Sequence, residues 1–287
     1  VITELPLVIV NVQRGGPSTG LPTKTEQSDL MQALYGRNGE SPVVVIASST
    51  PSNCFDYAFE ASRIALERMT PVILLTDGFL ANGTEPWKIP DMDDFPDINP
   101  PIAKEGSKDW LPYNRDEHTL AREWAKAGIP GLEHRVGGLE KMAGSGNVSY
   151  VPENHEYMVG IREEKVNRVE DMIPEQEIIG DPDADLLIIG WGGTYGHLVT
   201  AVSEIQREGY KVALAHFNYI KPLPKNTGEI LGQFKKHLVC ELNLGQFAHY
   251  LRMNYPKYNY LQYNKVQGLP FIVQELKDFI LKNLEEK

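Results

Sequence analysis

Cysteine is nearly absent from this chain: the 287 residues include only Cys54 and Cys240. The two are far apart and form no Cys-x-x-Cys pair, and two thiolates are too few to hold an iron–sulfur cluster. So low a cysteine content is typical of a reducing compartment, so we expect free thiols and a cytoplasmic protein.

Long apolar runs and an excess of positive charge are also missing. No run approaches the ~18 apolar residues of a membrane helix, and no signal peptide is visible, so no membrane partner is expected. Lysine and arginine total 28 against 39 aspartates and glutamates, a formal charge of -11. This balance argues against nucleic acid as the main partner.

Several signatures of catalysis are lacking. The seven histidines form neither an HxH nor an HExxH pattern, so no metal site is predicted. The chain has no G-x-S-x-G nucleophile turn, no G-x-x-x-x-G-K phosphate loop and no kinase signature. The chemistry of this protein therefore has to be sought elsewhere in the sequence.

What is present is an ordinary globular composition, 41% hydrophobic and 23% charged, at a length that predicts about two domains. The apolar, β-branched run 7–12 predicts a strand covered on both faces. Further strands are expected at 42–47 and 72–76. Strand, helix and strand at this spacing form a βαβ unit, so the sheet is predicted to be parallel.

Two helices are expected in this first part. Thr25 is a candidate N-cap for a short helix that ends at about Tyr35. Asn53 followed by Asp56 resembles a capping box, which opens a helix to about Met69.

The middle of the chain has a different composition. Six prolines between residues 86 and 112 exclude long helices there, and the segment 134–157 is rich in glycine. We expect an ordered, extended connection with a helix at about 159–172. In the last third, strands are expected at 185–190, 212–216 and 237–242. A helix is expected after the first of these strands, ending at Gly209, and two more are expected at about 229–234 and at 271–284.

We therefore predict an α/β fold of two parallel-sheet, three-layer domains, residues 1–84 and 181–287, joined by an extended region at 85–180. The chain begins with Val1 and enters almost directly on a strand. We expect it to be a fragment whose first sheet has further strands outside this sequence.

The most informative segment follows the first predicted strand. A guanidinium at the carboxyl end of a parallel strand presents a planar fork to a carboxylate or phosphate, and glycines let the backbone turn beside it. The alternative, which the residues favour equally, is a structural turn whose arginine pairs with a nearby acid. The residues concerned are Arg14, Gly15, Gly16, Ser18, Thr19 and Gly20.

Two further segments are weaker candidates. Asp77 ends the third predicted strand, on the same edge as Arg14 if the strands are parallel, so its carboxylate is a candidate ligand contact. Capping a helix is the commoner role for such a residue. Gly190-Trp-Gly-Gly-Thr-Tyr-Gly196 has the setting of a dinucleotide fingerprint but the wrong spacing, which favours close packing over nucleotide binding.

The segment Gln13-Arg-Gly-Gly-Pro-Ser-Thr-Gly-Leu-Pro-Thr-Lys-Thr-Glu-Gln27 resembles the alpha subunit of 2-oxoacid:ferredoxin oxidoreductases, and the 2-oxoglutarate members are most similar. Pyruvate and branched-chain relatives tend to lack the Ser-Thr-Gly-Leu-Pro-Thr sequence at 18–23. Other segments agree, in order, along almost the whole chain: Asp77-Gly-Phe-Leu80, His134-Arg-Val-Gly-Gly-Leu-Glu140, Gly146-Asn-Val-Ser-Tyr150, Gly190–Gly196 and Gln262-Tyr-Asn-Lys-Val-Gln-Gly-Leu-Pro270.

The resemblance implies a thiamine diphosphate enzyme that oxidatively decarboxylates 2-oxoglutarate to succinyl-CoA, with coenzyme A as co-substrate and ferredoxin as electron acceptor, or runs in reverse. It implies a hetero-oligomer whose beta subunit carries the diphosphate, Mg²⁺ and a [4Fe–4S] cluster, with a gamma domain or subunit also possible. The implied substrate-binding residues are Arg14, Ser18 and Thr19, and the implied cofactor-proximal residues are Gly15, Gly16, Gly20 and Asp77.

Under this resemblance, residues 1–84 are the later half of a pyrimidine-binding domain and residues 181–287 are a transketolase C-terminal-like domain. The family's pyrimidine-activating glutamate precedes the arginine motif and is not in this sequence. We assign that role to neither Glu4 nor Glu26, and we expect activity only with the partner subunit. Two alternatives stay open: a non-catalytic scaffold of such a complex, and a broad-specificity subunit that also accepts pyruvate or branched-chain 2-oxoacids.

Overall fold

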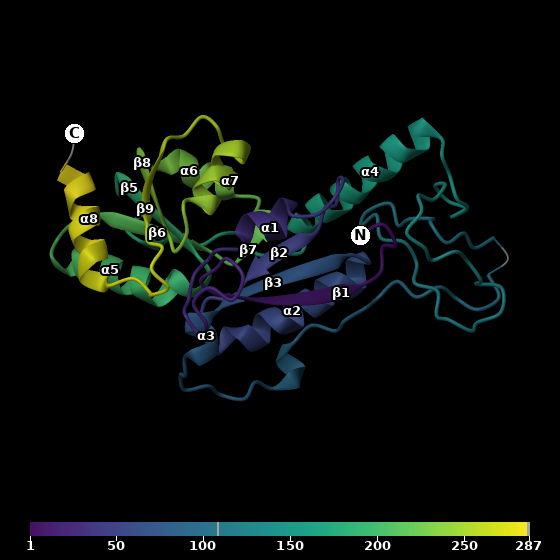
Figure 1. Cartoon of the computed structure of the whole chain (residues 1–287), viewed down its shortest axis with the longest axis horizontal. Coiled ribbons are helices and arrows are strands. Elements are labelled where there is room, and N and C mark those ends of the chain that lie inside the picture. Colours follow the sequence, from purple (N-terminus) through teal and green to yellow (C-terminus); the bar gives the residue numbers. More distant parts are fainter. Residues whose placement is uncertain (108, 286–287) are drawn as a thin grey trace.

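A computed structural model describes residues 1–107 and 109–285 of the chain. Its strands form two sheets that lie side by side (Figure 1). The strands are β1 (Leu7–Gln13), β2 (Val44–Ala47), β3 (Pro71–Asp77), β4 (Ile179–Gly180), β5 (Leu186–Trp191), β6 (Val212–Phe217), β7 (Tyr219–Lys221), β8 (Lys236–Glu241) and β9 (Tyr260–Asn264).

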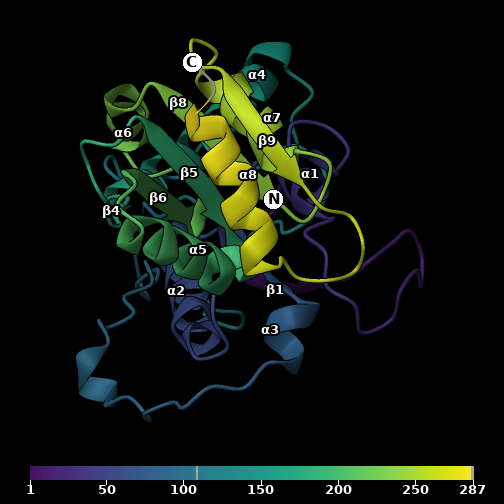
Figure 2. The same ribbon diagram turned by 90° about the vertical axis from the view of Figure 1, so that its left-hand side faces the viewer.

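Helices cover both sheets. In Figure 2, α5 and α8 lie next to each other across one face of the second sheet. The helices are α1 (Leu30–Tyr35), α2 (Asn53–Arg68), α3 (Gly78–Asn82), α4 (Pro152–Asn167), α5 (Tyr195–Arg207), α6 (Thr227–Gln233), α7 (Gln246–Asn254) and α8 (Val273–Glu285), with short 3-10 turns η1 (Met92–Asp94), η2 (Arg168–Asp171) and η3 (Gly192–Thr194).

The first sheet has the order β1-β3-β2-β7 and the second the order β4-β6-β5-β8-β9. We call the first sheet with α1 to α3 the first unit, and the second sheet with α5 to α8 the second unit. Both are parallel, as predicted, except that β7 and β4 pair antiparallel with their neighbours. Because β7 belongs to the last third of the chain, that part also extends the first sheet. The boundaries 1–84, 85–180 and 181–287 stay a prediction.

The two units share one hydrophobic core. Side chains alternate along each central strand. On β2, Val45 and Ala47 point into this shared core, whereas Val44 and Ile46 pack toward α2. On β5, Leu187 and its alternate neighbours enter the same shared core, and the opposite face packs against α5 and α8. Burial on both faces explains why these strands are continuous apolar runs.

Strand β1 corrects one expectation. It forms where predicted, but it lies at the edge of its sheet and is not covered on both faces. Leu7, Ile9, Val10 and Val12 are 45–55% exposed. An apolar run predicts a strand, but which neighbours cover that strand depends on the fold and not on the run itself.

Local capping signals were also misread. Thr25 does not cap α1, which begins five residues later, and its hydroxyl donates to Asp77 instead. Asn53 is the first residue of α2 and not its N-cap, because its side-chain oxygen accepts from Ser49 and Thr50 before the helix. Thr25 thus makes a tertiary contact, and Asn53 closes the turn before its helix.

The connecting region is extended, as expected, up to residue 151. Helix α4 then begins seven residues before the predicted start of 159, with Pro152 in its first turn, where proline fits well. The elements α3, α7, β4, β7 and β9 were not predicted. None of the described helices is long and apolar enough to cross a membrane.

Candidate functional site

Arg14 lies where the first sheet ends. Gln13, the last residue of β1, is opposite Asp77, the last residue of β3, in a parallel pair, so both chain segments leave the sheet at the same edge. The Arg14 guanidinium is exposed and donates from Nη1 to the carbonyl oxygen of Thr19. Its remaining N–H groups form no other hydrogen bond within the part of the chain described. The structure thus brings Arg14 and the end of β3 to one edge, as predicted.

The segment 14–24, here called the arginine loop, is closed by its own backbone. The Gly15 N–H donates to Lys24 O (3.1 Å), and the Leu21 N–H donates back to Gly15 O (2.9 Å). Gly20 has φ +50°, and a Cβ there would lie 2.1 Å from Gly15 O. Only glycine fits this position. Gly15 and Gly20 therefore shape the loop that presents the arginine.

A cavity of about 600 Å³ opens beside this loop. Of the site residues inferred from the sequence, Arg14, Gly16 and Ser18 line it; Gly15, Thr19, Gly20 and Asp77 do not. Sequence reasoning missed the residues that the second unit contributes, because nothing local indicates that they lie beside the arginine loop. The complete lining is Asn11, Val12, Arg14, Gly16, Pro17, Ser18, Glu26, Ser28, Asp29, Asn243, Leu244, Gln246 and Val266.

Acidic groups share this cavity with the arginine. Glu26, 7% exposed, lies against Gly15. Asp29 is engaged by its neighbours, since its two carboxylate oxygens accept from Asn11 Nδ2 (3.2 Å) and Ser28 Oγ (3.1 Å). Arg14 is thus the one cationic side chain among the described residues that line the cavity, beside two carboxylates, a balance that does not suit a diphosphate.

Asp77 is used inside the protein. Its Oδ1 accepts from the Thr25 hydroxyl (3.0 Å) and from the N–H groups of Phe79 (2.8 Å) and Leu80 (3.1 Å), so it caps α3. Burial raises its pKa, against these hydrogen bonds and one from the Gly193 backbone. With its oxygens surrounded by donors, the side chain serves to join segments of the fold.

The glycine motif Gly190–Gly196 packs closely, as the spacing favoured. A Cβ on Gly190 would lie 2.2 Å from Leu198 Cδ1 and 3.1 Å from the His216 ring, so β5 and α5 pack closely at this glycine. Gly192 has φ +59° and faces the amide of Gln27. The motif is thus a contact between the two units.

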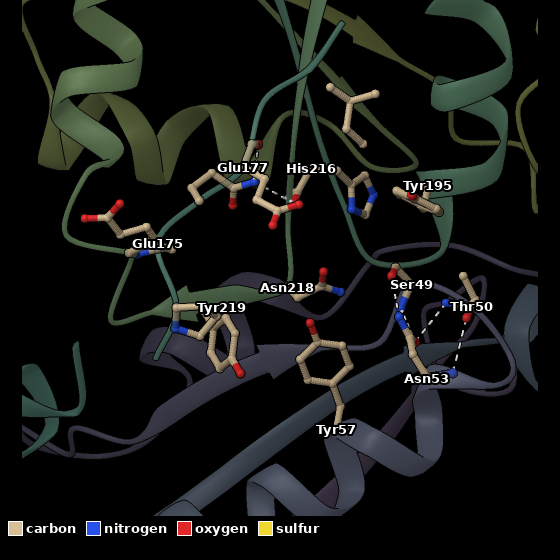
Figure 3. A pocket seen from close by; sticks show the side chains of 14 residues that line it. Ser49, Thr50, Asn53, Tyr57, Glu175, Glu177, Tyr195, His216, Asn218 and Tyr219 are labelled. Atoms are coloured by element: carbon tan, nitrogen blue, oxygen red, sulfur yellow. Dashed lines mark hydrogen bonds between the residues drawn. The ribbon is translucent and has the colours of Figure 1, made fainter. Parts of the chain in front are cut away.

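A second cavity, of about 450 Å³, is lined by a separate set of residues (Figure 3). Tyr57, Tyr195 and His216 are among its lining residues, and it contains none of the site residues inferred from the sequence. Burial lowers the pKa of His216 to about 3, so this imidazole is neutral at pH 7. The cavity offers no cation for a 2-oxoacid, and the arginine cavity remains the candidate site.

Within residues 1–107 and 109–285, no cluster of three or more His, Cys, Asp or Glu side chains could hold a metal ion. Cys54 and Cys240 are both free, as expected from the sequence.

Comparison with known proteins identifies the family. The family model described as pyruvate flavodoxin/ferredoxin oxidoreductase, thiamine diphosphate-binding, matches residues 1–150. The 2-oxoglutarate oxidoreductase subunit KorA of Mycobacterium tuberculosis is 52% identical over 98% of this chain and 42% of that protein. The 2-oxoglutarate synthase subunit KorA of Methanothermobacter marburgensis is 31% identical over 85% of this chain and 64% of that protein.

A solved structure agrees. The 2-oxoglutarate:ferredoxin oxidoreductase from Magnetococcus marinus, with 2-oxoglutarate, coenzyme A and succinyl-CoA bound, superposes with a TM-score of 0.91 and 33% identity, covering 99% of this chain and 50% of that chain. The predicted fold class, two parallel-sheet units of the thiamine-enzyme type, is confirmed. The chain spans about half the length of the relatives it matches. It belongs to the pyruvate flavodoxin/ferredoxin oxidoreductase family.

Proposed function

We propose that this chain is part of the alpha subunit of a thiamine diphosphate-dependent 2-oxoglutarate:ferredoxin oxidoreductase. The reaction is the CoA-dependent oxidative decarboxylation of 2-oxoglutarate to succinyl-CoA and CO₂, with two electrons passed to ferredoxin, or its reverse. The observation that carries the proposal is the 52% identity, over nearly the whole chain, to a subunit named for 2-oxoglutarate. The exposed arginine beside a cavity of suitable size supports it.

In this proposal Arg14 binds the substrate carboxylate. Its guanidinium uses one N–H on Thr19 O, which holds the side chain to its own loop and leaves the other donors for a ligand. The Ser18 hydroxyl lines the same cavity and supplies a further donor. Thr19 contributes through its carbonyl oxygen, as a support for the arginine. The glycines let the loop close around these groups.

The cofactor is shared with a partner. Bound thiamine diphosphate supplies a nucleophilic carbon and a place for the electron pair released by decarboxylation. The cavity has too little positive charge for a diphosphate, so we assign the diphosphate and Mg²⁺ to a beta subunit. Two cysteines far apart cannot hold a [4Fe–4S] cluster, so that cluster, too, is assigned to the partner. The free thiols favour a cytoplasmic location.

The test is reconstitution of the full-length alpha subunit with its beta subunit, followed by iron and thiamine analysis and 2-oxoacid kinetics. We expect Arg14→Ala to raise KM for 2-oxoglutarate about 10- to 100-fold while the complex stays assembled, because a charge-assisted hydrogen bond contributes about 1.5–3 kcal/mol. Arg207→Ala, an exposed arginine on α5, is the matched control and should change KM less than twofold.

Other outcomes identify the alternatives. Loss of assembly in Arg14→Ala with unchanged KM would favour the scaffold. Equal kcat/KM for pyruvate and 2-oxoglutarate in the unaltered complex would favour broad specificity. Absence of iron, thiamine and 2-oxoacid turnover in the complex would overturn the proposal.

A further inference from the structure

The cavity beside Arg14 is built by both units. One wall consists of the end of β1 and the arginine loop. The opposite wall consists of Asn243, Leu244, Gln246 and Val266, more than 200 residues later in the sequence. Residues 243–246, here called the 243–246 loop, connect β8 to α7. The second unit therefore contributes to the candidate site and does not serve assembly alone.

Buried hydrogen bonds fix the shape of the 243–246 loop. Glu241, fully buried, accepts from the Phe247 N–H (2.7 Å), the Ala248 N–H (3.0 Å) and Asn243 Nδ2 (2.9 Å). Asn243 Oδ1 in turn accepts from the Gly245 N–H (2.7 Å). So many bonds over a few residues leave the loop one conformation.

The same loop is bonded to the segment that directly follows the arginine loop. Asn243 Nδ2 donates to Gln27 O (2.9 Å), and Gln246 Nε2 donates to Ser28 O (2.8 Å). The Ser28 hydroxyl lies 3.0 Å from Arg14 O and 3.1 Å from Asp29 Oδ1, and its one proton is shared between these two acceptors. The backbone of Arg14 and the 243–246 loop are thus joined by a short chain of hydrogen bonds, so the width of the cavity between them is set by the fold.

Leu244 lies at the tip of this fixed loop and is 75% exposed. Val12 and Val266, also half-exposed, line the same cavity. Together, Leu244, Val12 and Val266 give this cavity an apolar side. The cavity therefore combines a cation at Arg14 with an apolar surface, the arrangement that suits an acid with an aliphatic chain.

We propose that Leu244 packs against the carbon chain of the 2-oxoacid whose carboxylate is bound by Arg14, and so helps to set the chain-length preference of the enzyme. This inference rests on the proposed function. It makes the second unit a determinant of specificity, through one apolar contact that the 243–246 loop holds in place.

The test compares substrates in the reconstituted complex of full-length alpha and beta subunits. We expect Leu244→Ala to lower kcat/KM for 2-oxoglutarate about 5- to 20-fold and kcat/KM for pyruvate less than twofold, since pyruvate lacks the extra methylene groups. Leu244→Met, which keeps the volume, should restore most of the ratio. Leu261→Ala, an exposed leucine on β9, is the control and should leave both values unchanged.

Three results would overturn the inference. An unchanged ratio of the two kcat/KM values in an active Leu244→Ala complex would remove Leu244 from the substrate site while leaving the proposed function intact. Loss of the beta subunit from Leu244→Ala on size exclusion would make Leu244 a partner contact instead. If the unaltered complex turned over no 2-oxoacid, the proposed function would fail first, and the inference with it.

Discussion

Replacing Glu4 tests how the connecting region is attached to the first unit. The Glu4 carboxylate is 1% exposed. It pairs with both terminal nitrogens of Arg115, at 2.6 and 2.7 Å, and with Lys165 on α4, whose ammonium also donates to Met69 O (2.9 Å). One buried carboxylate thus serves two buried cations from segments more than 110 residues away.

Burial and the neighbouring charges together explain the direction of both pKa shifts. Burial would raise the pKa of Glu4, but the charges of Lys165 and Arg115 and their hydrogen bonds outweigh it and lower the pKa to about 2. Burial lowers the pKa of Lys165 to about 8, because a carboxylate shared with Arg115 compensates only partly. The folded chain therefore strongly favours the charged form of Glu4, whereas burial disfavours the charged form of Lys165.

We expect Glu4→Gln to lower the free energy of unfolding at pH 7 by about 3–5 kcal/mol, because it leaves two buried cations without a counter-charge. The fall in pKa from 4.5 to about 2, at ~1.4 kcal/mol per pH unit, independently gives about 3 kcal/mol. Lys165→Met should cost less than about 1 kcal/mol, since the pair of Glu4 and Arg115 remains. Urea unfolding followed by circular dichroism measures all of these values.

Acid titration and a control complete this test. Because the pKa of Glu4 is lower in the folded chain than in the unfolded chain, its stabilisation is complete above about pH 4.5 and is lost as the pH falls toward 2. The difference between the native chain and Glu4→Gln should shrink over that range. Glu164→Gln, an exposed carboxylate on α4 paired with Arg168, should change stability by at most about 0.5 kcal/mol. A difference below 1 kcal/mol at pH 7, or one independent of pH, would refute the reasoning.

Two further predictions concern the arginine loop and its attachment, both measured by urea unfolding. Gly20→Ala should lower the free energy of unfolding by about 2–3 kcal/mol, because the new Cβ would meet Gly15 O. Gly39 has φ +68° and open space around it, so the control Gly39→Ala should lower it by about 1 kcal/mol. Equal losses in the two variants would contradict the clash. Gln27→Leu should lower the free energy of unfolding by about 2 kcal/mol, because the buried N–H of Leu242 loses its acceptor. Gln206→Leu, which removes a half-buried hydrogen bond, should lower it by less than about 1 kcal/mol. Similar losses in both variants would count against a special role for Gln27.

The central strands could be predicted from the sequence because their burial on both faces makes them continuous apolar runs. One such run forms β3 and ends before Gly78. Another follows Pro42 and forms β2. Strand β1 has the same composition, yet its neighbours leave it exposed. Helix α7 was missed because its N-cap position is Gly245, in a left-handed conformation. Its first N–H groups are bound instead by Asn243 and by Glu241 at the end of the preceding strand.

The candidate site was predictable only in its local part. Arg14 and its glycines form one continuous segment, so a strand end followed by a flexible turn was visible in the sequence. The wall from the second unit was not visible, because the bonds that position it, such as that from Gln246 to Ser28, join residues 218 positions apart. Nothing in the local sequence of either residue indicates its partner.

The features that first suggested separate ligand sites instead form one joint between the units. Asp77 accepts from Thr25, just after the arginine loop, and its carboxylate lies where any side chain on Gly193 would collide with it. Gln27 donates to the carbonyl of Trp191, beside the same glycines. The buried hydrogen bonds of Thr25 and Gln27 fix the segment that leads from the arginine loop into α1. An acidic residue and a glycine motif at strand ends therefore need not contact a ligand themselves; here they hold the exposed arginine in place at the sheet edge.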